Sequence, residues 1–199
     1  MKRQSGEAIP ITPDGLPARV QGRRREVLAA AARVFAEKGY QAASIRDIGR
    51  AVGLLGGSLY HYIKSKEELF IELHEAALDA AAEKIAARAE QASDPWERLA
   101  RACECLLEIR LDPHSITIPM MNDFQSVPPA VRERLVVKRD AFEEMFRDLV
   151  ADLPLPPEFD RSIFRNFLLS TINASPGWFR QGRCRPEELA SQLMLIFRH

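Results

Sequence analysis

Apolar residues recur at every third or fourth position along most of this 199-residue chain, and that spacing is the strongest constraint on its fold. The first such stripe consists of Val27, Ala30, Ala31, Val34 and Phe35. Residues spaced in this way share one face of an α-helix, whereas they would fall on both faces of a β-strand. Similar stripes continue towards the C-terminus, and no segment alternates for long enough to form a strand. The sequence therefore predicts an all-α fold.

Capping signals divide this helical pattern into separate helices. Ser44 and Asp47 have the spacing of a capping box, in which each side chain binds the backbone N–H group of the other residue. Ser65 and Glu68 repeat the spacing at the start of a longer stripe. Asp94 precedes a proline and, two residues further on, a glutamate, an order that favours the first turn of a helix. We therefore expect helices to begin directly after these three capping residues.

The first three helices have the lengths and breaks of a helix-turn-helix unit. Gly39 and Gly53 are expected to end the first and second helices, because glycine readily adopts the backbone conformation that closes a helix. In the third helix, Leu59 and Ile63 should face the core and leave the polar residues between them pointing outward. Such a helix can lie in the major groove of DNA. The alternative is that its tyrosines only pack against neighbours and leave their hydroxyl groups in water.

Charge is distributed unevenly along the chain, although the formal net charge is zero. Residues 19–66 contain ten basic and three acidic side chains, whereas residues 67–199 contain 16 basic and 23 acidic ones. A basic segment beside an acidic remainder suggests that only the first part meets a polyanion such as DNA. A chance imbalance of surface charge is the alternative.

Other kinds of chemistry find little support in the sequence. The four histidines do not cluster with Cys103 and Cys105, so we expect no metal site and no cofactor. No catalytic triad, P-loop or dinucleotide motif is present, and we do not expect an enzyme. No apolar stretch is long enough to span a bilayer, and residues 1–18 lack the features of a signal peptide. We expect a cytoplasmic protein with no membrane partner.

The segment RRREVLAAAARVFAEKGYQAASIRDIGRAVGLLGGSLYHYIKSKEELF, residues 23–70, resembles the DNA-binding domain of TetR-family transcriptional regulators. The match runs without a gap through the recognition helix GSLYHY and the SKEEL start of the fourth helix. The resemblance implies an all-α homodimer that binds double-stranded operator DNA and represses until a small molecule releases it. The expected parts are a flexible arm (1–18), a helix-turn-helix domain (19–66) and a ligand-binding and dimerisation domain (67–199).

The resemblance also implies a set of DNA contacts. The residues at the matching positions are Arg23, Arg24, Ser44, Arg46, Ser58, Tyr60, His61 and Lys66. Tyr60, His61 and Lys66 are expected to bind phosphate groups, and the two N-terminal arginines to enter a minor groove. Leu55 and Gly56 depart from the family pattern, which often has a hydroxyl-bearing residue there. That departure weakens any assignment of base-specific contacts at these two positions.

A second resemblance concerns the segment FLLSTINASPGWFRQGRCRPEELA, residues 167–190. It is similar to TetR-type regulators that respond to acyl-CoA thioesters, and it keeps Asn173, Trp178 and Gly182 of their pattern. It departs from that pattern at Ala174, where those regulators have a tryptophan, and at Phe179. The resemblance implies an acyl-CoA effector. The alternative is that this segment only forms the dimer bundle, with Trp178 packed against the partner subunit.

Apolar positions expected to face the middle of the second domain, together with two residues of this segment, supply a candidate effector site. They are Leu106, Ile109, Met121, Phe124, Phe142, Phe146, Phe167, Asn173 and Trp178. Such a lining suits an acyl chain, although plain core packing is the alternative for each residue. A second apolar set, expected to be exposed in a monomer, predicts the dimer contact. It consists of Phe164, Leu168, Leu189, Leu193 and Phe197.

Two other functions remain compatible with the same residues. One is a DNA-binding dimer whose second domain has no effector. The other is a regulator that responds to a different hydrophobic ligand, such as a drug-like compound.

Overall fold

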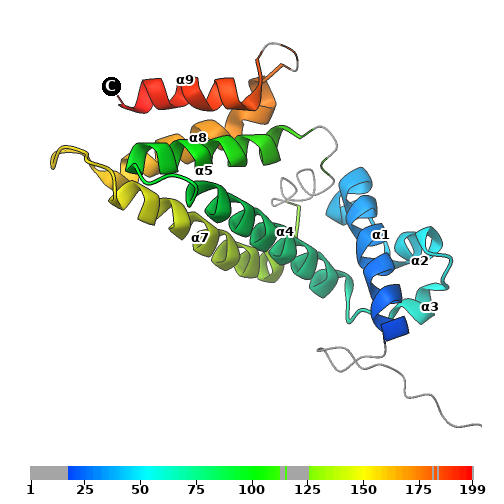
Figure 1. Ribbon diagram of the computed structural model, residues 1–199. Coiled ribbons are helices and arrows are strands. Elements are labelled where there is room, and N and C mark those ends of the chain that lie inside the picture. Colours follow the sequence, from blue (N-terminus) through cyan, green and yellow to red (C-terminus); the bar gives the residue numbers. More distant parts are fainter. Residues whose placement is uncertain (1–17, 113–114, 116–125, 181, 183, 199) are drawn as a thin grey trace, which may run out of the picture.

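The structure, a computed structural model, describes residues 18–112, 115, 126–180, 182 and 184–198, which form eight helices and no strand (Figure 1). The helices are α1 (Ala18–Ala42), α2 (Ile45–Ala51), α3 (Gly56–Leu59), α4 (Lys66–Ala89), α5 (Pro95–Leu111), α7 (Pro129–Ala151), α8 (Arg161–Trp178) and α9 (Pro186–Arg198). The prediction of an all-α fold is therefore confirmed. Within the described ranges, no helix is both long enough and apolar enough to cross a membrane.

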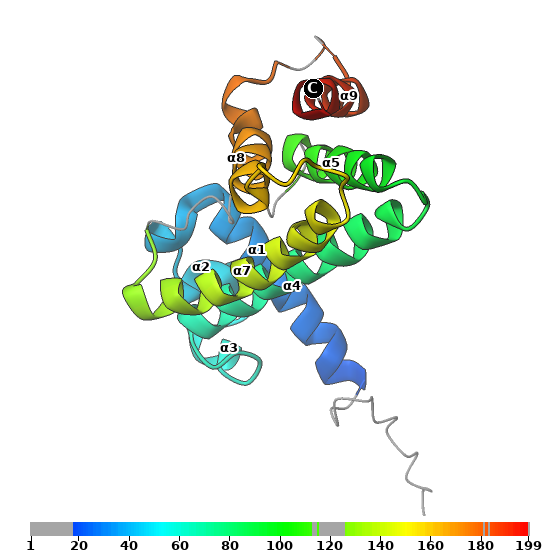
Figure 2. The ribbon, with the colours of Figure 1, turned by 90° about the vertical axis from the view of Figure 1, so that its left-hand side faces the viewer.

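The helices form a small N-terminal unit and a larger bundle. Helices α1, α2 and α3 pack together at one end of the molecule, and α5, α8 and α9 are stacked at the other (Figures 1 and 2). Helices α4 and α7 lie side by side, α5 packs on α4, and α9 covers α5. Because α4 begins in the small unit and runs into the bundle, it joins the two parts.

The helix starts follow the predicted capping signals. The N–H of Asp47 donates to Ser44 Oγ and the N–H of Ser44 donates to Asp47 Oδ2, both over 3.1 Å, which completes the capping box. Ser65 caps α4 by accepting a 3.1 Å hydrogen bond from the N–H of Glu68, and Asp94 caps α5 in the same way at 3.0 Å. These predictions are confirmed, and such caps stabilise a helix by about 1 kcal/mol each.

Two glycines produce the breaks of the small unit. Gly39 has φ 73° and ψ 167°, so α1 consists of two helical pieces joined across a kink, and Gly53 has φ 65° after the end of α2. Helix α3 is only four residues long, shorter than the pattern suggested. It begins with two glycines, and each lowers helix stability by roughly 1 kcal/mol relative to alanine. Leu59 and Ile63 are nevertheless buried, as predicted.

Each unit has its own hydrophobic core, and two helices contribute to both. The core of the small unit includes Phe70 of α4 and Leu135 of α7 beside residues of α1, α2 and α3. The core of the bundle includes Ile85 of α4 and Phe146 of α7 beside residues of α5, α8 and α9. The small core therefore extends past residue 66, into helices that also belong to the bundle.

The apolar set predicted to be exposed for dimerisation is buried instead. Its members Phe164, Leu168, Leu189 and Leu193 lie in the core of the bundle, and Phe197 packs against that core. The large apolar residues that are exposed on α8 and α9 are Ile163, Phe167, Trp178, Leu195 and Ile196. Both helices carry apolar residues on two faces, and periodicity alone does not tell which face meets the protein's own core.

Replacing Gly39 with alanine should destabilise the protein, because its backbone conformation is one that only glycine adopts readily. We expect Gly39→Ala to lower the free energy of unfolding by about 1–3 kcal/mol. Gly22→Ala, in the same helix with open space around its Cβ position, should be neutral or stabilise by up to about 1 kcal/mol. Urea denaturation of both variants measures the difference, and equal stabilities would contradict the kink at Gly39.

Candidate functional site

The short third helix and the turn after it present polar groups to solvent. Tyr60 is 58% exposed, His61 is exposed, and Ser58 is half-buried. The fully buried side chain of Leu59 holds this surface against the small core. Hydroxyl and imidazole groups bind phosphate oxygens and the edges of bases. The structure thus brings three of the predicted DNA contacts together on one exposed segment.

Leu55 is a feature of this surface that the sequence pattern did not reveal. Its side chain is 82% exposed. Because it lies four positions before Leu59, a continuous helix would turn both side chains to the same buried face. Leu55 is instead the N-cap of α3 with extended backbone, φ −67° and ψ 145°, and it points outward. An exposed leucine at this place is suited to contact a thymine methyl group.

The start of α2 carries a tight network of polar groups. Ser44 Oγ donates a 2.6 Å hydrogen bond to Asp47 Oδ2, and Lys38 Nζ lies 2.9 Å from Asp47 Oδ1. The hydrogen bonds from Ser44 and Lys38 lower the pKa of Asp47 to about 2, so its carboxylate stays charged. Ser44 and Arg46 are exposed beside this network. Ser44 therefore caps α2 in addition to its predicted phosphate contact.

Lys66, at the start of α4, is held against the end of α1. Its ammonium lies 4.3 Å from the centroid of the Tyr40 ring and donates to the carbonyl of Gln41 at 3.4 Å. Burial lowers the pKa of Lys66, and burial together with the neighbouring Glu67 raises the pKa of Tyr40 to about 12. The cation is thus positioned by the small unit before any DNA is present.

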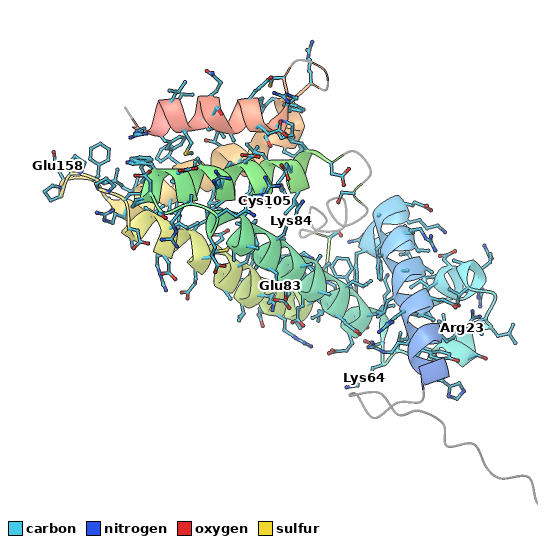
Figure 3. The ribbon with its side chains drawn as sticks, viewed as in Figure 1. Arg23, Lys64, Glu83, Lys84, Cys105 and Glu158 are labelled. Atoms are coloured by element: carbon cyan, nitrogen blue, oxygen red, sulfur yellow. The ribbon has the colours of Figure 1, made fainter. Side chains whose placement is uncertain are left out.

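Arg23 and Arg24 lie within α1, and both make contacts inside the protein. Arg23 donates a 2.6 Å hydrogen bond to the carbonyl of Val52, beside the turn that precedes α3. Arg24 forms two hydrogen bonds of 2.6 and 2.7 Å with the carboxylate of Glu72 on α4. Figure 3 places Arg23 on the small unit. These contacts order the unit, and the expected minor-groove role of the two arginines stays a prediction.

The residues predicted to line the effector site fall into two groups. Leu106 and Phe146 are buried in the core of the bundle, and Ile109 and Phe142 are partly buried against it. The rings of Phe142 and Phe146 lie 6.3 Å apart. The structure therefore brings these four together between α5 and α7. Two further predicted residues, Met121 and Phe124, lie outside the described residues.

The second group lies on α8 and faces away from the bundle interior. Phe167 is 67% exposed, Trp178 is 51% exposed, and Asn173 is exposed. The expectation that Phe167 faces the middle of the domain is therefore wrong. Helix α8 has apolar residues on two faces, and periodicity alone did not tell which face meets the core. A ligand role for these three residues stays a prediction.

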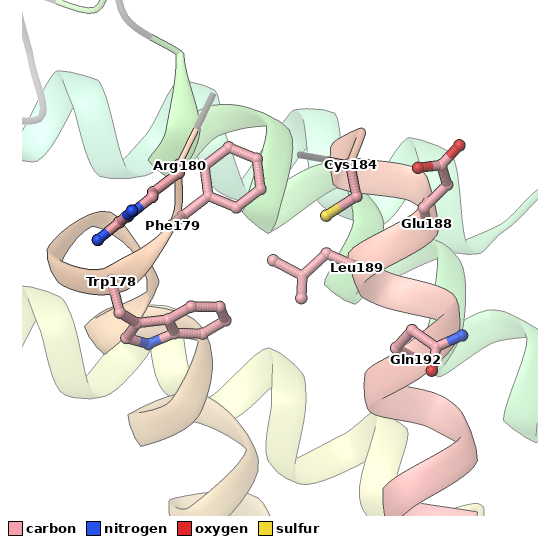
Figure 4. Close-up of a pocket in the computed structure, with 7 residues that line it drawn as sticks. All are labelled: Trp178, Phe179, Arg180, Cys184, Glu188, Leu189 and Gln192. Atoms are coloured by element: carbon pink, nitrogen blue, oxygen red, sulfur yellow. The ribbon is translucent and has the colours of Figure 1, made fainter. Parts of the chain in front are cut away.

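A cavity of about 520 Å³ opens between the end of α8 and the start of α9 (Figure 4). Its lining consists of Trp178, Phe179, Arg180, Cys184, Glu188, Leu189 and Gln192. Trp178, Phe179 and Arg180 come from the segment that resembles acyl-CoA-responsive regulators. The cavity combines aromatic and aliphatic surface with one guanidinium group and one carboxylate, that of Glu188, which pairs with Arg185 at 3.2 Å. Such a lining suits a ligand that is part apolar and part polar.

Buried His74 and half-buried Arg110 are two polar residues of the bundle helices for which sequence periodicity gave no signal. His74 on α4 is 3% exposed, and its Nδ1 has no hydrogen-bond partner. Burial, and to a smaller extent the charge of Arg139, lower the pKa of His74 to about 4. Arg110 on α5 donates to the carbonyl of Asn173 at 3.0 Å, while its Nε is buried without a partner.

A group of three carboxylates, Glu104, Glu108 and Glu187, has oxygens within 4.8 Å of one another. Arg88 pairs with two of them, at 3.1 Å from Glu104 and 3.2 Å from Glu108. These ion pairs neutralise much of the acidic charge, so the group acts as a link between α4 and α5. On the same helix as Glu104, burial raises the pKa of Cys103 to about 12, so that thiol stays protonated.

Two family models match this chain. The family model described as bacterial regulatory proteins, tetR family, matches residues 27–73. A second model, described as tetracyclin repressor-like, C-terminal domain, matches residues 92–199, which is more than half of the chain. The HTH-type transcriptional repressor KstR2 of Mycolicibacterium smegmatis is 28% identical over 192 residues, covering 94% of this chain and 93% of that protein.

Solved structures show the same fold. Superantigen PfiT matches with a TM-score of 0.79 and 26% identity, over 88% of this chain and 96% of that one. AibR in complex with isovaleryl coenzyme A and operator DNA matches with a TM-score of 0.75, over 87% of this chain and 97% of that one. AibR is 21% identical to this chain, and its likeness shows the fold alone.

The buried His74 should make the protein sensitive to acid. Its pKa is about 4 in the folded protein and near 6.5 when unfolded, so between these values the unfolded chain binds more protons. Stability should therefore fall as the pH drops from about 6.5 to about 4, by roughly 3 kcal/mol from this group. His74→Gln should flatten this part of the curve, whereas His61→Gln, at an exposed position, should not. Urea denaturation at several pH values measures the free energy of unfolding of each protein. If this free energy depends on pH in the same way in His74→Gln and in the unchanged protein, His74 is not buried as a neutral imidazole.

Proposed function

The chain belongs to the TetR family of bacterial regulatory proteins, and from that premise we propose that it is a DNA-binding repressor whose homodimer leaves its operator when an acyl-CoA thioester binds. The observation that carries the proposal is the exposed polar surface of α3 on a basic unit whose core is shared with the ligand-binding bundle. In this proposal the protein acts in the cytoplasm, where the operator DNA of a bacterium lies.

The small unit supplies both general and specific contacts to DNA. Its excess of basic side chains attracts the phosphate backbone, which supplies much of the affinity of such proteins. In this proposal, Tyr60, His61 and Lys66 bind phosphates on either side of the groove that α3 enters. Leu55 and Ser58 supply the base contacts in this proposal, since they lie at the start of the recognition helix.

DNA affinity should fall steeply with salt, because each phosphate contact releases condensed counterions. Lys66→Gln should weaken binding to operator DNA and to random DNA by similar factors. It should also reduce the slope of log affinity against log salt concentration by about 1 per subunit. Tyr60→Phe should weaken binding to both DNAs without changing that slope. Lys84→Gln removes a charge from the far part of α4 and should leave affinity and slope unchanged (Figure 3). Fluorescence anisotropy over a range of salt concentrations measures both. A change of sequence preference at unchanged affinity would contradict the phosphate assignments.

Dimerisation is proposed through the exposed apolar surfaces of α8 and α9. Phe167 is 67% exposed and Ile196 is 70% exposed, and Ile163 and Leu195 add to the same two helices. A monomer would leave these side chains in water, whereas a two-fold contact between identical helix pairs would bury them. Two copies of α3 could then meet successive turns of a symmetric operator.

The double variant Phe167→Arg, Ile196→Arg should give folded monomers that have lost most operator affinity. Both side chains are exposed in the subunit, so the charges disturb only the contact between subunits. Leu168→Arg serves as the contrasting variant, since it places a charge at a fully buried position and should unfold the protein. Sedimentation velocity with circular dichroism separates these outcomes. A Phe167→Arg, Ile196→Arg protein that remains dimeric would contradict the proposed contact.

An acyl-CoA thioester is proposed as the effector for two reasons. The segment with the acyl-CoA resemblance contributes Trp178, Phe179 and Arg180 to the cavity between α8 and α9. The shared fold holds isovaleryl coenzyme A in AibR. A ligand that binds the DNA-free arrangement more tightly than the DNA-bound one shifts the protein away from the operator. The shared helices α4 and α7 would carry that shift to the small unit.

A panel of aliphatic and aromatic acyl-CoA thioesters, titrated into the operator complex and followed by anisotropy, tests the effector. At least one thioester should lower operator affinity by about 5–150-fold, the usual range of allosteric coupling. Trp178→Ala should raise the thioester concentration required, whereas Val137→Ala, an exposed position on α7, should not. Free CoA and free acids are the controls. If no thioester releases the DNA, the acyl-CoA assignment falls, and a different hydrophobic ligand or a DNA-binding dimer without effector remains.

A further inference from the structure

Arg110 is a cation inside the bundle without a counter-ion among the described residues. It lies in the last turn of α5, is half-buried, and donates to the backbone carbonyl of Asn173 on α8. Its Nε is buried and has no partner. Burial, and to a smaller extent the like charge of Arg139, lower the pKa of Arg110. Such a group gains from any anion that reaches it.

Two further polar groups, on helices that pack against α5, also lack partners. His74 of α4 has a buried Nδ1 without a hydrogen bond, and the hydroxyl of Ser175, two residues beyond Asn173 on α8, is fully buried and unpaired. Arg139 of α7 lowers the pKa of both His74 and Arg110, and the three helices that carry these residues pack against one another. Buried polar groups normally have partners, and several orphaned groups between the same helices indicate that a ligand completes them.

We propose that Arg110 and His74, with Arg139 beside them, bind an anionic oxygen group of the regulatory ligand, a carboxylate or a phosphate. The guanidinium of Arg110 supplies the charge and its free Nε–H a hydrogen bond, and the imidazole supplies one further hydrogen bond. Arg139 also pairs with Glu143 at 3.2 Å. Its contribution is therefore mainly long-range electrostatic attraction of the anion and not a direct contact. The groups come from α4, α5 and α7, and Arg110 reaches α8 as well.

This inference rests on the proposed function and narrows it to an effector class. Asn173 precedes Trp178 of the α8–α9 cavity by five residues, or roughly 7.5 Å along the helix. An acyl-CoA that enters there could present either of two anionic parts to Arg110. One is a carboxylate at the far end of its acyl chain, and the other is a phosphate of the CoA portion. The chemistry of recognition is the same, and the choice of ligands separates the two sources.

The test measures binding to the full-length dimer by isothermal titration calorimetry without DNA, and operator release in parallel. The probes are adipoyl-CoA, which ends in a carboxylate, hexanoyl-CoA, which has the same chain length without it, free adipate and inorganic phosphate. Arg110→Gln is compared with Arg101→Gln, which removes another half-buried arginine of the same helix, one that pairs with Glu97 at 2.7 Å. We expect Arg110→Gln to raise the dissociation constant of the probe that binds best by about 10-fold or more. Arg101→Gln should leave that dissociation constant unchanged.

The pattern across the probes decides the source of the anion. A loss confined to adipoyl-CoA and adipate assigns a carboxylate, and an equal loss for both thioesters assigns a phosphate. If every dissociation constant is the same in Arg110→Gln and Arg101→Gln, or if no probe binds, the anion site is wrong. If Arg110 has a purely structural role, Arg110→Gln should lower the melting temperature and leave the dissociation constants unchanged. Ligand binding that depends on Arg110 but does not release the operator would support the anion site and contradict the proposed function. Operator release that does not depend on Arg110 would support the proposed function and contradict the anion site.

Discussion

The structure depends on the sharing of α4 and α7 between two hydrophobic cores. Phe70 and Leu135 of these helices lie in the core of the small unit, while Ile85 and Phe146 lie in the core of the bundle. Ion pairs such as that of Arg134 with Glu68, at 2.7 Å, join the same two helices but are exposed, and pairs of this kind contribute little. Apolar packing therefore determines how the recognition helix is placed relative to the bundle.

Close-packed cores do not deform continuously, so a shared helix moves as a unit or not at all. In the proposed mechanism, a ligand in the bundle moves α4 and α7 and so changes the spacing of the two recognition helices. The coupling needed is only about 1–3 kcal/mol, which is small against the stability of a domain. A movement of α4 should be transmitted to α1, because Lys66 binds Gln41 of α1 and Arg24 of α1 binds Glu72 of α4.

Local signals in the sequence predicted the helices well, and long-range packing accounts for what they missed. Ser44, Ser65 and Asp94 cap their helices as expected, because a cap depends only on residues three positions apart. The exposed face of α8 was assigned to the wrong stripe, since Leu168 and Phe167 are both apolar and only the position of neighbouring helices separates them. The unpaired groups of Arg110 and His74 were missed for the same reason, because their surroundings come from residues distant in sequence. Leu55 was missed because its extended N-cap backbone breaks the helical spacing that would bury it with Leu59.

The position of the proposed anion site gives it a direct route to the DNA-binding surface. His74 lies on α4 one turn after Phe70, whose ring is 6.0 Å from the imidazole and belongs to the core of the small unit. Arg139 lies on α7 one turn after Leu135, which belongs to that same core. An anion drawn between them by Arg110 thus acts on both shared helices where they leave the small unit. A ligand confined to the α8–α9 cavity would touch neither helix, so an effector that also supplies an anion to Arg110 should couple more strongly to DNA binding than one that fills the cavity alone.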